Sequence, residues 1–190
     1  WLIHVPFINA WRREYKTQNY RYYWVVEDDA RLTGDDYGAF FAKYDNVTGD
    51  FLSAFFAPED YNVMRDYNWL VPERVVRKAK EHVQRYSPWF LNELHVLHTL
   101  GLATEGEFFA ATACNANPDC TAHDLSDDDV IGSTYRPAGR MSPSRWRDTI
   151  HSEPNKWFHA LKWLGSKRTL NHSIHLHHID WPTHYLDNCD

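Results

Sequence analysis

One stretch decides how this chain folds: Tyr22-Tyr23-Trp24-Val25-Val26-Glu27-Asp28-Asp29-Ala30-Arg31. Its aromatic and β-branched residues, 22–26, predict a buried strand in a sheet that is covered on both faces. The three carboxylates that follow do not belong in a core, because an unpaired charge is costly to bury. Ligands of open α/β sheets bind beyond the carboxyl ends of the strands. The stretch therefore predicts a site for a divalent cation, Mg²⁺ or Mn²⁺, that could in turn hold a diphosphate.

A simpler interpretation of the same acids is structural. Aspartates often follow strands, where they form Asx-turns or cap a helix, and Asp28 or Asp29 could cap the turn into a helix expected over residues 35–44. Three acids in a row exceed the needs of one turn, which favours the metal interpretation.

The acidic stretch resembles the metal site of nucleotide-sugar glycosyltransferases with the GT-A fold. Their signature is an Asp-x-Asp motif at a strand end, and Glu27-Asp28-Asp29 is an acidic variant of it. The segment Arg31-Leu32-Thr33-Gly34-Asp35 extends the likeness. The string Tyr-x-Trp-x-x-Glu-x-Asp-x-Arg-x-Thr-Gly is similar to a family of poorly characterised, largely fungal and algal glycosyltransferase-like proteins. The resemblance covers Tyr20 to Ala113.

This resemblance implies one α/β domain over residues 1–190, with a GT-A-like (Rossmann-like) mixed sheet flanked by helices. Only about twenty residues precede the strand, so we expect the N-terminal βα units to be absent. The implied activity is a metal-dependent transfer of a sugar from a nucleotide-sugar donor to a glycan or glycoprotein acceptor. Glu27, Asp28, Asp29 and Arg31 would bind the cofactor, with Glu27 and Asp29 on the metal.

Two further sets of residues are candidates for the site by the same resemblance. GT-A enzymes commonly recruit a C-terminal histidine as a metal ligand, and alternation places His175 and His177 on one face of an expected strand. Imidazole ligands would favour Mn²⁺ over Mg²⁺. Glu107 opens an apolar helix and is the candidate general base of an inverting enzyme, with a pKa raised by its apolar neighbours. Favourable interaction with the helix dipole is the structural alternative for acids at this helix start.

The composition narrows the class of protein. A net charge of −6 argues against nucleic acid as a partner, and no apolar run is long enough to span a membrane. Aromatic residues make up 16% of the chain, and Trp and Tyr suit carbohydrate stacking as well as packing. The loop between Cys114 and Cys120 can close a disulfide that leaves Cys189 free. With sequons at Asn46 and Asn171, it points to the lumen of the secretory pathway (Golgi or ER), with any anchor upstream of the chain.

The remaining patterns predict the other elements. We expect a strand over residues 50–56, helices over 72–86, 89–100 and 157–164, and a long loop with little core over 121–155. Ser87 should cap the helix 89–100 and Gly101 should end it. The triplet Asp127-Asp128-Asp129 follows no strand, so we expect it to be solvated.

Two other functions stay open at this point. The acids and the C-terminal histidines could form a metal-dependent hydrolase or phosphoesterase site, although the chain has no His-x-Asp or Gly-Asn-His string. The chain could also be a non-catalytic, degenerate transferase fragment that keeps the fold without a donor pocket.

Overall fold

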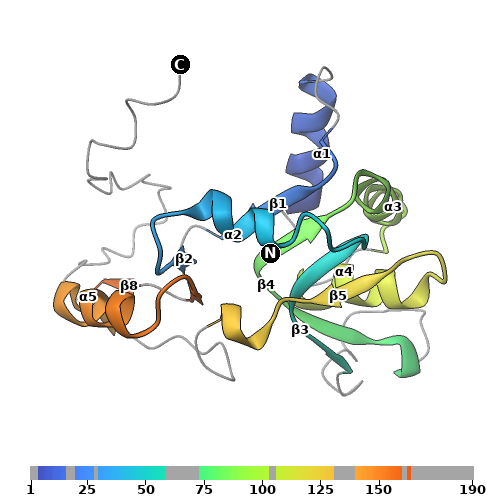
Figure 1. The fold of residues 1–190 in the computed structure, drawn as a ribbon. Helices are drawn as coiled ribbons and strands as arrows, with labels where there is room; N and C mark the ends of the chain where they lie inside the picture. Colours follow the sequence, from blue (N-terminus) through green and yellow to red (C-terminus); the bar gives the residue numbers. More distant parts are fainter. Residues whose placement is uncertain are drawn as a thin grey trace, which may run out of the picture.

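The computed structural model describes residues 4–15, 20–27, 30–58, 73–102, 106–130, 140–159 and 162–163. Its centre is a four-stranded sheet of order β1-β4-β3-β5 (Figure 1), with bounds β1 Tyr23–Val26, β3 Phe51–Pro58, β4 Arg77–Tyr86 and β5 Ala122–Asp124. Strand β4 pairs antiparallel with β1 and β3, and β5 pairs parallel with β3. The prediction of a mixed α/β sheet with flanking helices is confirmed.

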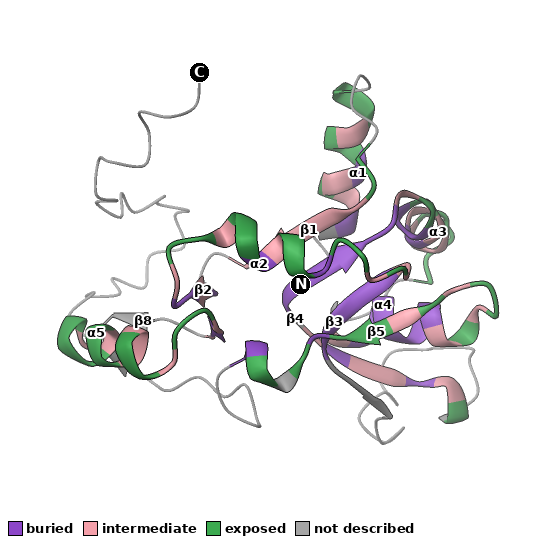
Figure 2. Ribbon diagram, in the orientation of Figure 1, coloured by how far each residue is buried: buried purple, intermediate pink, exposed green. Residues whose placement is uncertain are grey.

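Strand β1 forms where the sequence predicts a strand, but it is not the buried strand that we expected. It lies at one edge of the sheet in the described part of the chain, its first three residues are half-buried, and Val26 is exposed. Figure 2 colours this strand mostly pink, in contrast to the buried stretch of β4 beside it. The predicted strand 50–56 is confirmed as β3, although β4 separates it from β1.

One face of the sheet is covered by three helices. Helices α3 (Pro88–Thr99) and α4 (Gly106–Ala116) contribute Phe90, Leu91 and Phe109 to a core around Phe51. Helix α1 (His4–Glu14) lies beside α3, where the Asn9 side-chain amide donates to the Leu91 carbonyl at 3.0 Å. The predicted ends of α3 are confirmed. The Ser87 hydroxyl accepts from the Phe90 N–H, and Gly101 follows with a positive φ of 75°.

The opposite face holds a second core. Helix α2 (Tyr37–Lys43), capped by Asp36, packs Phe40 against Leu52, Val83 and the fully buried Trp157. A buried guanidinium ties this face together, because Arg85 donates to the carbonyls of Tyr44 at 2.7 Å and Val47 at 2.8 Å. Burial lowers the pKa of Arg85, and these carbonyls accept from its two terminal nitrogens.

The helix predicted over residues 72–86 is wrong. A short 3₁₀ helix, η2 (Glu73–Val75), leads into β4, which pairs with a strand on each of its sides. Shifts of the β3–β4 register at Ser53/Ala54 and Ala54/Ala57 break the alternation of the strand. The buried apolar residues Val76, Ala79 and Val83 are three and four positions apart, which is the spacing of a helical stripe and explains the wrong prediction.

The C-terminal predictions also need correction. Residues 121–155 are not one long loop, because they contain β5, the 3₁₀ helix η3 (Asp127–Asp129), β6 (Arg140–Met141) and α5 (Pro143–Ser152). Asp128 is exposed as expected, but Asp129 is buried and binds the Lys43 ammonium at 2.7 Å and the Tyr44 hydroxyl. Burial and Asp129 both raise the pKa of Tyr44.

The helix predicted over 157–164 is replaced by two short strands. Strand β7 (Trp157–Phe158) pairs with β2 (Arg31–Leu32), and β8 (Lys162–Trp163) pairs with β6. The apolar residues of this segment pair with strands that the local sequence does not reveal.

The disulfide between Cys114 and Cys120 is confirmed, with Cα atoms 5.1 Å apart. Its cysteines lie at the end of α4 and just before β5, while Cys189 lies outside the described residues.

Among the described helices, none combines the length and apolar character that crossing a bilayer requires.

Candidate metal centre

The site begins where β1 ends. Val26 lies opposite Val83 of β4, and the backbone N–H of Glu27 continues the ladder by donating to the His82 carbonyl at 2.9 Å. Glu27 and His82 are thus cross-strand neighbours, and neighbouring side chains in an antiparallel pair lie close together. The Glu27 carboxylate and the His82 Nδ1 atom are in direct hydrogen-bond contact.

A second histidine reaches Glu27 from the C-terminal part of the chain. His159 directly follows β7, and its Nε2 atom lies 3.5 Å from the same Glu27 oxygen. Two features hold β7 in this position. Trp157 is fully buried against the rings of Tyr37 and Phe40, and β7 pairs with β2, which begins four residues after Glu27.

Thr33 and Gly34, which follow the acidic stretch, contact this C-terminal segment and hold it in place. The Thr33 N–H donates to the Lys156 carbonyl at 2.9 Å, and its hydroxyl accepts from the Lys156 N–H at 2.9 Å. At Gly34 a β-carbon would lie 2.0 Å from the Asn155 side-chain oxygen, so that side chain would have to move aside. The two residues therefore help to place His159 beside Glu27.

Together these residues form what we call the Glu27–His82–His159 cluster. One ligand atom from each side chain lies within 4.8 Å of the others, and the two imidazoles stack with centroids 3.2 Å apart and planes at 13°. The side chains are largely buried, with exposed fractions of 13%, 11% and 13% in the order of the name. A neutral imidazole keeps one nitrogen lone pair, so the cluster offers one carboxylate oxygen and two nitrogens to a cation. That donor set suits Zn²⁺, Fe²⁺ or Mn²⁺ better than Mg²⁺ or Ca²⁺, which prefer oxygen ligands.

Of the residues predicted for the site, Glu27 is in this cluster. Arg31 lies in β2 opposite Phe158, with its guanidinium donating to the Ala30 carbonyl at 2.8 Å. Asp28, Asp29, His175 and His177 lie outside the described residues, so their assignments stay predictions.

Glu107 is placed with different partners. Phe108 and Phe109 are buried and anchor the start of α4. The Glu107 carboxylate, however, binds the Lys78 ammonium at 3.1 Å and the Lys80 ammonium at 3.2 Å. Burial acts to raise the pKa of Glu107, but the hydrogen bond from Lys78 and the charge of Lys80 outweigh it and hold the pKa below its ordinary value. The predicted raised pKa is therefore wrong, and the base assignment loses that support.

Sequence reasoning missed His82 and His159. His82 was hidden because residues 72–86 suggested a helix, although as a strand the same residues place His82 across from Glu27. His159 carried a weak signal, since it follows the aromatic pair Trp157-Phe158 as Glu27 follows Val25-Val26. Neither pattern names a partner in the other segment.

Comparisons of the chain with protein-family models, with curated proteins and with solved structures give no match.

Proposed function

We propose that this chain is a divalent-metal-dependent glycosyltransferase domain of the GT-A type, with Glu27, His82 and His159 as metal ligands. The observation that carries the proposal is the position of the cluster. A carboxylate at the end of β1 meets two imidazoles from distant parts of the chain, at the point where the acidic motif predicts a cation. Two further carboxylates, Asp28 and Asp29, follow Glu27 directly in the sequence.

The donor set fits Mn²⁺, the metal that the histidines favour over Mg²⁺. A divalent cation at the cluster supplies a Lewis acid that offsets the charge on the diphosphate of a nucleotide-sugar donor. The side chains contribute position. Cross-strand pairing orients Glu27 and His82, and the Thr33 contacts orient the segment that carries His159. The acceptor in this proposal is a glycan or a glycoprotein.

A disulfide and an exposed sequon support a lumenal location for this activity. The Cys114–Cys120 disulfide is of the kind that persists in oxidising compartments. Asn46 and Thr48 of the first sequon are both exposed, so an N-glycan can be attached to the folded chain at Asn46. The second sequon, at Asn171, lies outside the described residues.

The test is Mn²⁺ binding, measured by isothermal titration calorimetry, followed by turnover with a nucleotide-sugar panel. His82→Ala and His159→Ala should each weaken Mn²⁺ affinity by roughly tenfold or more, since even the loss of a residue that only orients a ligand costs about 10–100-fold. The matched control is His151→Ala, which removes an exposed histidine at the end of α5 and should leave affinity unchanged. Equal Mn²⁺ affinity in all four proteins would contradict the proposed metal site.

A metal-dependent hydrolase is the second candidate, because two histidines with one glutamate also bind catalytic zinc in hydrolases. The two functions differ in metal and substrate. A hydrolase should be activated by Zn²⁺ and cleave an ester, phosphoester or peptide without a nucleotide sugar, whereas the transferase should release nucleotide diphosphate only from a sugar donor.

A further inference from the structure

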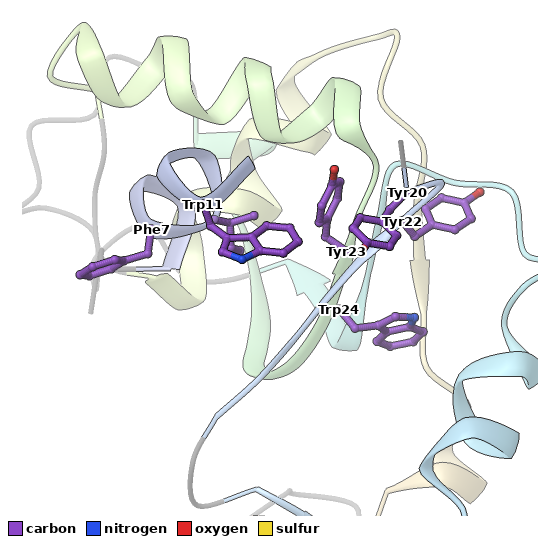
Figure 3. A pocket seen from close by; sticks show the side chains of 7 residues that line it. Phe7, Trp11, Tyr20, Tyr22, Tyr23 and Trp24 are labelled. Atoms are coloured by element: carbon purple, nitrogen blue, oxygen red, sulfur yellow. The ribbon is translucent and has the colours of Figure 1, made fainter. Parts of the chain in front are cut away.

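We propose that a groove beside β1 is the subsite for a neutral glycan chain, an inference that rests on the proposed function because it names the acceptor class. The groove has a volume of about 580 Å³, and six of its seven lining side chains are aromatic (Figure 3): Phe7, Trp11, Tyr20, Tyr22, Tyr23 and Trp24. Helix α1 supplies the first two, and the residues leading into and through β1 supply the others.

The rings are arranged as a floor and a wall. Trp11 and Tyr20 are nearly parallel, with planes at 20° and centroids 6.0 Å apart, so they are displaced sideways and neither ring covers the other. Both remain about two-fifths exposed, at 41% and 42%. Tyr23 stands edge-on to both of them at 82°. A flat aromatic surface with Tyr hydroxyls and a Trp N–H at its margins matches a sugar ring, which has an apolar face and a hydroxyl rim.

Charge supports the same ligand class. None of the seven lining residues is charged. Guanidiniums do lie against the lining rings. Arg12 lies 5.0 Å over the Tyr23 ring and donates to the Asn92 side chain at 3.0 Å. Arg85 and Arg21 lie 3.7 Å and 5.2 Å over the Tyr22 ring, and Arg85 donates to backbone carbonyls. Arg12 and Arg85 already have acceptors within the protein, and the lining itself supplies no cation to a phosphorylated or acidic ligand, whereas a neutral oligosaccharide needs none.

The groove and the proposed metal centre lie along the same segment of chain. Tyr23 and Glu27 are on one extended segment, four residues apart, which corresponds to about 13 Å along a strand. A glycan lying on Trp11 and Tyr20 can thus extend along β1 toward the Glu27–His82–His159 cluster. An added peptide strand, the usual ligand of a sheet edge, would instead need pockets for alternate side chains.

The experiment measures binding of neutral gluco-, manno- and xylo-oligosaccharides by saturation-transfer NMR and titration calorimetry. We expect wild-type protein to bind at least one of these series. Trp11→Ala should weaken that binding by about tenfold or more, because the stacking surface that the indole ring offers is lost. Trp11→Tyr should restore most of it, which separates lost stacking from damage to α1. Trp89→Ala, which removes a similarly exposed ring on α3, is the control and should bind like wild type.

Two outcomes would overturn the glycan assignment. One is that no oligosaccharide binds. The other is that Trp11→Ala instead abolishes self-association in sedimentation runs, which would make the groove an interface between copies of this chain. Mn²⁺ titration of the same proteins tests the metal site independently of glycan binding. Trp11→Ala should keep wild-type Mn²⁺ affinity, and Glu27→Gln should keep glycan affinity.

Discussion

The carboxylates of Glu27 and Glu107 have similar burial and similar numbers of basic neighbours, but they differ in the chemistry that those neighbours allow. Glu27 and Glu107 are both largely buried, and each contacts two basic side chains. The partners of Glu107 are lysines, whose ammonium groups carry donors and no lone pair. The partners of Glu27 are imidazoles, each of which can present a nitrogen lone pair to a cation. The residues that contact the carboxylate, more than the carboxylate itself, therefore decide whether it forms a closed ion pair or a site that can bind a metal.

The largest effect should come from removing the anchor of the Glu27 site. Trp157→Ala should lower the free energy of unfolding by about 3–5 kcal/mol in urea denaturation, because a large, fully buried ring is lost. It should also weaken Mn²⁺ binding, since β7 carries His159 into the cluster. The control Trp89→Ala, at a partly exposed ring, should cost at most about 1 kcal/mol. A Trp157→Ala protein that unfolds like wild type would refute this view of β7.

The next largest effect should be the difference in Mn²⁺ affinity between variants of Glu27 and Glu107. Glu27→Gln removes the only carboxylate of the cluster and should reduce Mn²⁺ affinity by roughly 100-fold, at the upper end of what indirect changes cost. Glu107→Gln, a chemically identical change, should leave Mn²⁺ affinity within about twofold. The measurement is titration calorimetry at one pH and one salt concentration. Similar losses in both variants would place Glu107 in the metal site and erase the contrast.

A smaller loss of stability should follow from a change confined to the region of Glu107. Cys120→Ser opens the disulfide that ties α4, the helix of Glu107, to the segment before β5. The chain-entropy model gives a loss of about 2 kcal/mol for so short a loop. Urea denaturation should show this loss, while Mn²⁺ affinity stays unchanged because the cluster lies on other elements. Reduced wild-type protein should match the variant. A concurrent loss of metal binding would show that the two regions are coupled.

The smallest effect is the pH dependence of the Glu107 ion pairs. The lysines hold the folded-state pKa of Glu107 below its ordinary value, so the carboxylate stabilises the fold above about pH 4.3, the usual pKa of an unfolded glutamate. This contribution should disappear as the pH falls through the lowered folded-state pKa. The difference in unfolding free energy between wild type and Glu107→Gln should therefore be about 1–2 kcal/mol at neutral pH and shrink toward zero in acid. A difference that grows in acid would reverse the assigned sign.

The same Glu107→Gln protein tests the base role once a donor and acceptor are found. A general base should cost about 10²-fold or more in turnover when it is removed. An ion-pair role should leave turnover near the wild-type rate, and we expect that second result from the lowered pKa.

The sequence by itself determined the features that depend on near neighbours. Short patterns predicted the strand at residues 22–26, the Ser87 cap, the Gly101 stop, the helix that Glu107 opens and the Cys114–Cys120 disulfide. Each rests on contacts between residues a few positions apart, so the local sequence contains both partners. The position of a candidate cation site at Glu27 came from the same kind of local signal, a strand that ends in acids.

Only the tertiary structure decided the partners of that acid. His82 and His159 are 55 and 132 residues from Glu27 along the chain, and no local pattern joins them. Residues 77–86 became a strand because β1 and β3 pair with both of its edges, although their apolar spacing also suits a helix. Likewise, Asp129 and the segment after Trp157 found buried partners that a scan of their own neighbourhoods does not show. Long-range pairing overrides local propensity because its hydrogen bonds and buried area outweigh differences of at most about 1 kcal/mol per residue in intrinsic preference.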